Sequence, residues 1–548
     1  MKKSRLSRTL AFLLCLGLAL SVSAPALGCT GYYVGKDASA DGSVIIGRIS
    51  DMQPSFAPVR LEVTERVENV PGRTFFDEFP LPDTTWKCVS LFRGGVLMSG
   101  INEWGVACTG PLSVYSSKVA IDAGNAEKDT VSFADYYQFV LLTCKTAGEA
   151  IRELCRLYDA GGAHAYNSTM IADQNEAWYF WPVTRYQYCA VKLPDDCVSF
   201  YGNMPMLGTV DPDSPDVICS PDLFTLPEKY GFAVYDENGN MDLFKTYAQG
   251  KLIDYSNMRT WRGHQLMAPS TAGAYDPDTL YPLAYQPDHP ISLNDLSLLV
   301  RDRYEGTEYC PETTGRQDVR PIAYSHAVDA TILQLKPDLP ADISGVMWTC
   351  MANTEFAPFV PVSAAMSEFP AAWMNGDAAE PGQTASWPFK ELYGLCVLDR
   401  ENYGSGIKAY WEQEDARRFA LMEEKLEEAK ALYGSDPAGA AALLSTACTT
   451  EMEKALEDCK AIIDSLIAYI VDHCGIRDIL SVKYVPDPTV TVKEPNVEPF
   501  QPFKPLQANR YSLGNLTFAS AEEMNAFIVT LSAEELHELL NGTGTTEE

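Results

Sequence analysis

The sequence predicts a layered α+β fold in which short strands flank a helical stretch. Apolar runs of strand length, separated by turns, extend from Cys29 to about Leu112 and return between Ser168 and Tyr201. Between them, residues 132–158 place apolar side chains at helical spacing. Strands, then a helix, then strands again favour separate layers over a wound parallel sheet, in which strands and helices alternate.

Two of the first apolar runs predict a hairpin. Residues 32–35 and 43–48 are strand-like, and Asp41-Gly42 lies in the polar segment between them. An Asp-Gly pair between two such runs is a strong hairpin signal, because glycine adopts the positive φ that tight turns require. We therefore expect an antiparallel pair of strands close to Cys29.

The C-terminal part of the chain has a different composition. Residues 410–471 are rich in Glu, Ala, Lys and Leu and predict two or three amphipathic helices. Six prolines between residues 486 and 505 predict an extended linker. Beyond it, Ser520 and Ser532 each begin a candidate capping box that opens a short helix.

Composition excludes several classes of protein. The chain has 548 residues, of which 46% are hydrophobic and 11% aromatic, so its bulk is not disordered. Its 42 Lys and Arg against 74 Asp and Glu give a formal net charge of -32. Such a surface repels phosphate backbones and anionic lipid headgroups, so neither nucleic acid nor a membrane surface is an expected partner.

The N-terminus has the three parts of a secretory signal. Four basic residues precede an apolar stretch from Leu10 to about Val22, which is too short to suggest a permanent membrane span. Ala26 and Gly28 then supply the small residues that signal peptidase needs at the third and first positions before its cut. We therefore expect export and maturation by signal peptidase, which leaves Cys29 as the first residue.

An N-terminal cysteine carries a thiol and a free α-amine in one residue. The ordinary pKa of an α-amine is about 8, so at neutral pH it can accept the thiol proton without a catalytic histidine. A cysteine directly after a signal is also the lipid attachment point of bacterial lipoproteins, although that signal usually has Leu where this chain has Ala26. The local motif fits both interpretations about equally.

The residues around Cys29 favour a catalytic cysteine over a lipid attachment point, because they resemble a known family. Cys29-Thr30-Gly31, the Asp41-Gly42 turn and Arg48-Ile49-Ser50-Asp51 resemble the opening of N-terminal-nucleophile hydrolases of the choloylglycine hydrolase and penicillin V acylase type. They resemble still more closely the related bacterial dipeptidase family. Further matching blocks follow in order as far as about residue 430: residues 100–107, 168–178, 201–203, 255–262 and 325–361.

The resemblance implies a fold and a set of roles. The fold would be an αββα sandwich with a helical C-terminal addition. Cys29 would be the nucleophile, Arg48 would stabilise its thiolate, and Asp51 would hold the α-amine or the amine of the substrate. Asn203 would help to form the oxyanion hole, and Arg259 would support the site. Without the resemblance, Arg48 and Asp51 read as a surface ion pair, and Asn203 as a turn residue at a strand end.

One departure from the family pattern concerns the oxyanion hole. Thr109-Gly110-Pro111 stands where relatives often have Gly-Asn-Glu, which leaves the second oxyanion donor open. The six histidines show no metal-binding spacing, and no glycine loop for phosphates is present, so neither a metal nor a cofactor is expected. The fifteen cysteines form no recognisable disulfide framework, and their pairing stays open.

Together these features predict a secreted or extracytoplasmic cysteine dipeptidase that acts on dipeptides or short peptides. An amidase for N-acyl amino acids, conjugated bile salts or penicillin-like amides is the enzymatic alternative, and a lipid-anchored binding protein acylated at Cys29 is the non-enzymatic one. The oligomeric state, a homo-oligomer included, stays open. The predicted organisation has four parts: a signal peptide (1–28), the hydrolase domain (29–409), a helical segment packed on it (410–480), and a proline-rich linker with a short C-terminal segment (481–548).

Overall fold

The computed structural model divides the chain into two units, residues 1–490 and 491–548. In the second unit it describes only the hairpin of β15 (Ser512–Leu513) and β16 (Leu516–Thr517). The predicted signal peptide up to residue 27, most of the proline-rich linker and both predicted capping boxes lie outside the described residues. The structure describes residues 28–52, 59–75, 79–111, 116–124, 133–163, 168–316, 318–376, 383–473, 484, 486, 512–513 and 516–517.

The predicted hairpin opens a six-stranded antiparallel sheet in the first unit. Gly42 takes a φ of 75° in the turn, and the register places Cys29 opposite Ser50 and Gly31 opposite Arg48. The sheet has the following order: β10 (Val198–Tyr201), β1 (Gly28–Val34), β2 (Val44–Asp51), β12 (Ala327–Leu335), β13 (Gly345–Cys350) and β14 (Val360–Ser363).

A second, eight-stranded antiparallel sheet faces the first. This sheet has the following order: β11 (Val217–Cys219), β9 (Tyr188–Lys192), β8 (Ala177–Pro182), β7 (Thr169–Ala172), β6 (Ala107–Thr109), β5 (Val96–Asn102), β4 (Cys88–Arg93) and β3 (Val59–Thr64). Strand β2 contacts β6 and β7, and β13 contacts β5. Mixed helices and antiparallel sheets confirm the predicted α+β class.

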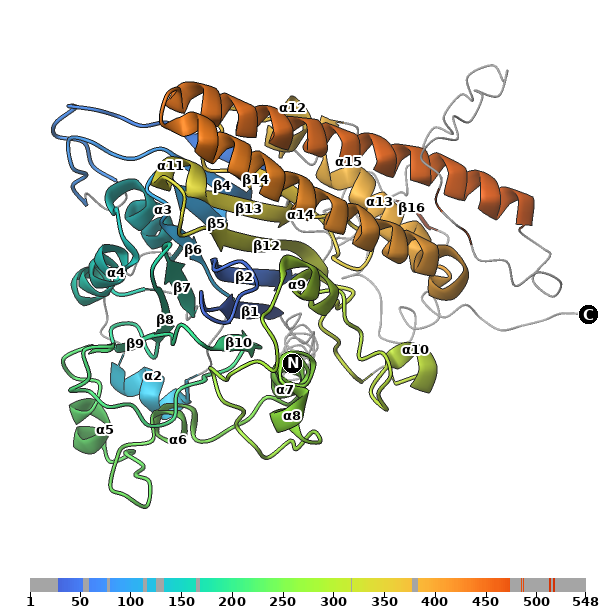
Figure 1. Ribbon diagram of the computed structural model, residues 1–548. Coiled ribbons are helices and arrows are strands. Elements are labelled where there is room, and N and C mark those ends of the chain that lie inside the picture. Colours follow the sequence, from blue (N-terminus) through green and yellow to red (C-terminus); the bar gives the residue numbers. More distant parts are fainter. Residues whose placement is uncertain are drawn as a thin grey trace, which may run out of the picture. The chain divides into compact units, whose positions relative to one another are not determined.

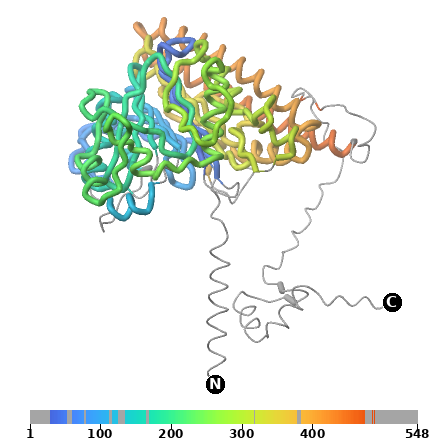
Figure 2. Tube along the Cα trace, turned by 90° about the horizontal axis from the view of Figure 1, so that it is seen from below, coloured from blue at the N-terminus to red at the C-terminus, as the bar shows by residue number. Residues whose placement is uncertain are grey.

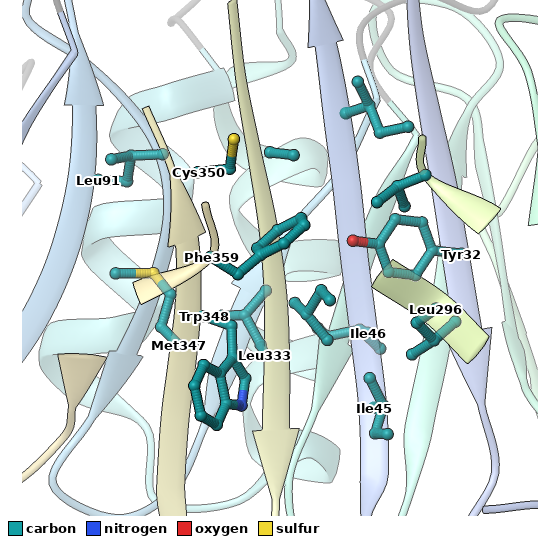
Figure 3. Packing of buried hydrophobic residues seen from close by; sticks show 14 of the residues in the cluster. Tyr32, Ile45, Ile46, Leu91, Leu296, Leu333, Met347, Trp348, Cys350 and Phe359 are labelled. Atoms are coloured by element: carbon teal, nitrogen blue, oxygen red, sulfur yellow. The ribbon is translucent and has the colours of Figure 1, made fainter. Parts of the chain in front are cut away.

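The main hydrophobic core includes side chains from both sheets, such as Leu91 of β4 and Trp348 of β13 (Figure 3). Packing is tight beside the hairpin, where the Tyr32 hydroxyl donates to the carbonyl of Thr331 (2.8 Å). A Cβ on Gly47 would lie 2.2 Å from the Tyr32 ring, so the strand register depends on glycine there. Each fully buried large apolar side chain contributes about 1.5–3 kcal/mol, which holds the first strands firmly in place.

Two helices cover the outer face of the eight-stranded sheet. Here the sequence prediction of one helix over residues 132–158 is wrong, because the structure has α3 (Phe133–Thr143) and α4 (Ala147–Gly161). Thr146 breaks the run: its extended backbone and its side chain, which accepts from the Glu149 amide, cap α4. Both helices contribute to a second hydrophobic cluster with strands of this sheet.

Helices also pack on the six-stranded sheet. Helix α7 (Asp254–Met267) contacts β10. The two longest described helices, α14 (Ser405–Tyr433) and α15 (Pro437–His473), lie side by side and contact β14 (Figures 1 and 2). This pair confirms the helices predicted within residues 410–471. The remaining described helices of the first unit are the following: α2 (Lys118–Gly124), α5 (Thr225–Tyr230), α6 (Leu243–Ala248), α8 (Pro269–Ala272), α9 (Leu293–Leu299), α10 (Pro311–Thr314), α11 (Ala341–Ser344), α12 (Ala371–Met374), α13 (Ser386–Cys396) and η3 (Arg400–Gly404).

None of the helices in the described part of the chain combines the length and the apolar character needed to cross a bilayer.

Candidate active site

The hairpin of β1 and β2 brings Cys29 and Arg48 to the same face of the six-stranded sheet. Cys29 lies opposite Ser50, and Arg48 is two residues before Ser50, so the three side chains share one face. That face is turned toward the eight-stranded sheet, because the Arg48 guanidinium donates to the carbonyls of Met98 (3.5 Å) and Gly110 (2.8 Å).

The Cys29 thiol lies against the Arg48 guanidinium. Arg48 Nη2 is 3.5 Å from Cys29 Sγ and also donates to Ser50 Oγ. Both Cys29 and Arg48 are 1% exposed. Because the carbonyls of Gly110 and Met98 accept from its other terminal nitrogen, Arg48 is held as a buried guanidinium beside the sulfur.

Asp51 belongs to a different cluster from Arg48. It is fully buried, and its Oδ2 accepts from Arg320 Nη2 (2.8 Å) and Arg259 Nη1 (3.3 Å). Its Oδ1 has no hydrogen-bond partner among the described residues. Burial raises the pKa of Asp51, and the guanidinium groups of Arg320 and Arg259 oppose that shift. Because Arg48 and Asp51 are buried and have separate partners, the alternative of a surface ion pair is wrong.

Asn203 and Arg259 hold the backbone of Cys29. The Cys29 nitrogen donates to Asn203 Oδ1 (2.6 Å), which also accepts from Arg259 Nη2 (3.0 Å). Arg259 Nη1 donates to the carbonyl of Cys29 (3.1 Å) and to Thr30 Oγ1 (2.7 Å). The main-chain nitrogen of Cys29 therefore contacts Asn203, whereas Asp51 is tied to the supporting arginines.

Arg259 reaches this position because α7 packs against the end of β10. The Gly202 amide donates to Thr260 Oγ1 (3.1 Å), which joins the residue before Asn203 to the helix. A Cβ on Gly202 would lie 2.6 Å from the carbonyl oxygen of Ser256, so the close approach of strand and helix requires glycine. Arg262, one turn further along α7, is also buried and forms an ion pair with Asp302 (2.6 Å).

Two further charged residues at the site, Asp329 and Arg320, were not predicted from the sequence. Asp329 of β12 lies opposite Ser50, accepts from Ser50 Oγ (2.7 Å) and from Arg93 Nη1 (2.9 Å), and is fully buried. Arg320 lies between the rings of Tyr255 and Tyr324, with centroid distances of 5.1 and 4.6 Å. Ser50 could have been found from strand alternation within the Arg-x-x-Asp motif, whereas Asp329 and Arg320 carry no signal in the sequence.

The arrangement supplies the parts of a covalent thiol mechanism: a nucleophile, a cation beside it, and an amide that binds its nitrogen. Within the described residues, no group of three His, Cys, Asp or Glu side chains is placed to hold a metal ion. The thirteen described cysteines carry free thiols.

Comparison with known proteins identifies the family. Residues 28–413 match the model of peptidase family C69. The chain belongs to this family. It is therefore a peptidase, and the resemblance to bacterial N-terminal-nucleophile cysteine hydrolases of the dipeptidase family is confirmed. A protein named probable dipeptidase B from Streptococcus pyogenes serotype M1 is 25% identical over 82% of this chain and 94% of its own length.

Two shorter matches agree with this assignment. A probable dipeptidase from Latilactobacillus sakei is 26% identical over 61% of this chain and 73% of its own length. A probable dipeptidase from Salmonella dublin is 26% identical over 63% of this chain and 82% of its own length. The matched family region covers every residue of the site described above.

Proposed function

We propose that the chain is an exported cysteine dipeptidase whose nucleophile is the thiol of Cys29 and whose base is the α-amine that removal of residues 1–28 creates. The observation that carries this proposal is the double anchoring of Cys29. Its sulfur lies 3.5 Å from the Arg48 guanidinium, and its nitrogen lies 2.6 Å from Asn203 Oδ1. The sulfur that would attack the substrate and the nitrogen that would act as the base both belong to Cys29. Each of these two atoms is thus held by a buried side chain.

Catalysis would proceed in two stages. The α-amine takes the thiol proton directly or through a water molecule, and the thiolate attacks the carbonyl carbon of the scissile amide. The resulting oxyanion is held by Asn203 Nδ2 and a backbone amide. The α-ammonium then protonates the leaving amine, a thioester forms, and water hydrolyses it with the amine again acting as base. Arg259 acts as a positioning residue through Asn203 and the Cys29 carbonyl.

Removal of Gly28 would open the site. A Cβ on Gly28 would lie 1.8 Å from Arg320 Nη2, so the residue before Cys29 fills the space next to this guanidinium. Gly28 also lies opposite Asp51 in the strand pair. Cleavage after Gly28 would therefore uncover Arg320 and the unpaired Asp51 Oδ1 next to the new α-amine, where Asp51 can bind an ammonium group of Cys29 or of the substrate.

The buried position of Cys29 favours a free cysteine over a lipidated one. In the structure, which retains Gly28, Cys29 is 1% exposed and its sulfur lies against Arg48, so a thioether-linked diacylglycerol would have to displace this contact. The signal sequence supports export. The arrangement of helices outside two facing sheets supports the αββα sandwich of N-terminal-nucleophile hydrolases, and the names of the relatives support dipeptides as substrates.

The test combines intact mass with a substrate panel. The secreted protein should begin with an unmodified Cys29 and hydrolyse dipeptides faster than N-acyl amino acids, bile-salt conjugates or penicillin V. A diacylglycerol adduct on Cys29 would contradict the mechanism. Faster hydrolysis of the N-acylated amides would retain the mechanism and assign the amidase activity instead.

A further inference from the structure

A cavity of about 230 Å³ lies at the end of the six-stranded sheet where β12 begins. Ala327 and Val328 of β12 line one side, Asn353 lines a second, and α13 contributes Trp387 and Lys390. Ala327 lies opposite Asp51 in the strand register, so the cavity is at the same end of the sheet as the candidate active site.

The strand register limits how far this cavity lies from the nucleophile. Cys29, Ser50 and Asp329 are opposite one another on three neighbouring strands, and Asp329 directly follows the cavity residue Val328. Two strand spacings correspond to about 10 Å between the first and the third backbone. An extended residue spans about 3.5 Å, and a lysine extends its charge on a flexible four-carbon stem. One substrate residue beyond the scissile bond can therefore reach toward Lys390.

The ammonium group of Lys390 is near a carboxylate but makes no ion pair with it. None of the described residues forms an ion pair with its ammonium group. Asp329, the carboxylate that attracts it, already accepts from Arg93 and Ser50. Burial lowers the pKa of Lys390, Asp329 raises it, and the nearby Arg93 lowers it further. Asp329 is thus near three basic side chains, those of Lys390, Arg93 and Arg48. The other carboxylate at this end of the sheet, Asp51, is already paired with Arg259 and Arg320, so this end favours an anionic ligand.

We propose that this cavity binds the C-terminal residue of the substrate and that the Lys390 ammonium binds the free α-carboxylate of that residue. The proposal rests on the proposed dipeptidase function. It gives a physical reason why the enzyme would prefer dipeptides to longer peptides. In a longer peptide, an uncharged amide would occupy the position of the carboxylate. Trp387, whose side chain is half exposed at the cavity, supplies an apolar wall for the side chain of the same residue.

The turnover test compares a dipeptide with its C-terminal carboxamide. The wild-type enzyme should prefer the free acid by at least about 10-fold in kcat/KM, as expected for a charge-assisted hydrogen bond. Lys390→Met should reduce this preference to about 2-fold or less, mainly through KM. Lys192→Met, which removes a half-buried lysine from β9 in the other sheet, should leave the preference unchanged. An unchanged preference in Lys390→Met overturns the proposal.

A binding test separates this proposal from the proposed function. Calorimetry on Cys29→Ala protein, with and without Lys390→Met, measures the affinity for the same two compounds without turnover. If the acid binds more tightly than the amide, and Lys390→Met removes this difference, the cavity binds the carboxylate. This conclusion holds even if the wild type cleaves neither compound. Equal affinity for acid and amide in the protein that retains Lys390 refutes it even if dipeptides are cleaved. The acid preference should also fade as pH rises through the lowered pKa of Lys390, below the ordinary lysine range.

A second, independent inference concerns Cys189 of β9 and Cys219 of β11. They are opposite each other, and their sulfurs are 3.7 Å apart. The adjacent pair is hydrogen-bonded, because the Ser220 amide donates to the carbonyl of Tyr188 (3.0 Å). Since such pairs alternate, Cys189 and Cys219 form a non-hydrogen-bonded pair with Cα atoms about 4.5 Å apart, within the range that a disulfide requires.

We infer that Cys189 and Cys219 form a disulfide in an oxidising compartment. Hydrogen bonding to Cys189 lowers the pKa of the partly exposed Cys219, whereas the pKa of Cys189 is raised. The Cys219 thiolate attacks the disulfide of an oxidant such as glutathione disulfide and releases one thiol. Cys189 then displaces the second thiol, so two protein thiols are oxidised as one external disulfide is reduced. The bond would tie the edge strand β11 to its sheet.

Peptide mapping after incubation with glutathione disulfide tests this inference. The expected product is a crosslinked pair of peptides that contain residues 189 and 219, with a loss of two hydrogens and a higher urea midpoint than the reduced protein. Cys219→Ser should show neither change. A stable glutathione adduct on Cys219 in the unmutated protein, or two thiols that remain open to alkylation, would overturn it.

Discussion

Replacing Arg48 with methionine tests whether its buried charge supports the nucleophile. Arg48 Nη2 lies 3.5 Å from Cys29 Sγ. At that distance a unit charge stabilises a thiolate by about 1 kcal/mol in a water-like medium and by about 5 kcal/mol at an effective dielectric constant of about 20. Since a tenfold change corresponds to about 1.4 kcal/mol, the thiolate fraction should fall by roughly 5-fold to 3,000-fold.

Two features of the site narrow this range. Cys29 and Arg48 are both buried, which favours the larger value, whereas Arg93 interacts electrostatically with Cys29 and retains part of the effect. We therefore expect iodoacetamide to label Cys29 at least about 30-fold more slowly at pH 7 in Arg48→Met, with the labelling profile displaced to higher pH.

Iodoacetamide labelling followed by mass spectrometry measures this rate, and the melting temperature reports whether the variant is folded. Arg60→Met is the matched control, because Arg60 lies on β3 in a partly exposed pair with Glu62 that is worth about 0–1 kcal/mol. A folded Arg48→Met protein that labels within about 2-fold of the wild-type rate would refute the role of Arg48.

Three further predictions concern other parts of the structure. Cys29→Ser, correctly processed, should lose nearly all turnover and keep its melting temperature, because a serine hydroxyl is a far weaker nucleophile when an amine is its base; near wild-type turnover would exclude Cys29. Asp51→Asn should lower turnover on free-amine dipeptides more than on N-acylated substrates, and equal loss on both in steady-state assays would exclude a contact with the substrate amine. Arg301→Met should lower the urea-measured free energy of unfolding by about 1.5–3 kcal/mol, because the buried Asp415 loses its 2.7 Å partner and keeps only Arg418 at 3.3 Å. The loss in the double variant Arg301→Met with Asp415→Leu should be smaller than the sum of the two single losses, and additive losses would contradict the pairing.

The sequence was sufficient to predict the parts of the fold that follow from local patterns. The Asp41-Gly42 turn predicted the hairpin that aligns Cys29 with Ser50, and the helical composition after residue 410 predicted α14 and α15. The break between α3 and α4 was missed, because apolar periodicity continues through it and the cap at Thr146 depends on a single side chain.

The candidate site was predictable only where residues are close in sequence or fall in a family motif. Arg48 and Asp51 were placed near Cys29 by the motif, but their separate partners follow from tertiary packing. Asp329 and Arg320 come from segments about 270 residues further along the chain, and the long-range pairing of β12 with β2 brings them to the site. No spacing rule connects such residues.

The N-terminus of Cys29 offers the most direct test of the proposed mechanism. Two preparations should be compared: one that begins with Cys29, and one that retains a single methionine before it, each verified by intact mass. An amide nitrogen cannot accept the thiol proton, so the preparation with methionine should be inactive on dipeptides although every side chain of the site is present. Full activity of the methionine-capped protein would contradict the use of the α-amine as base.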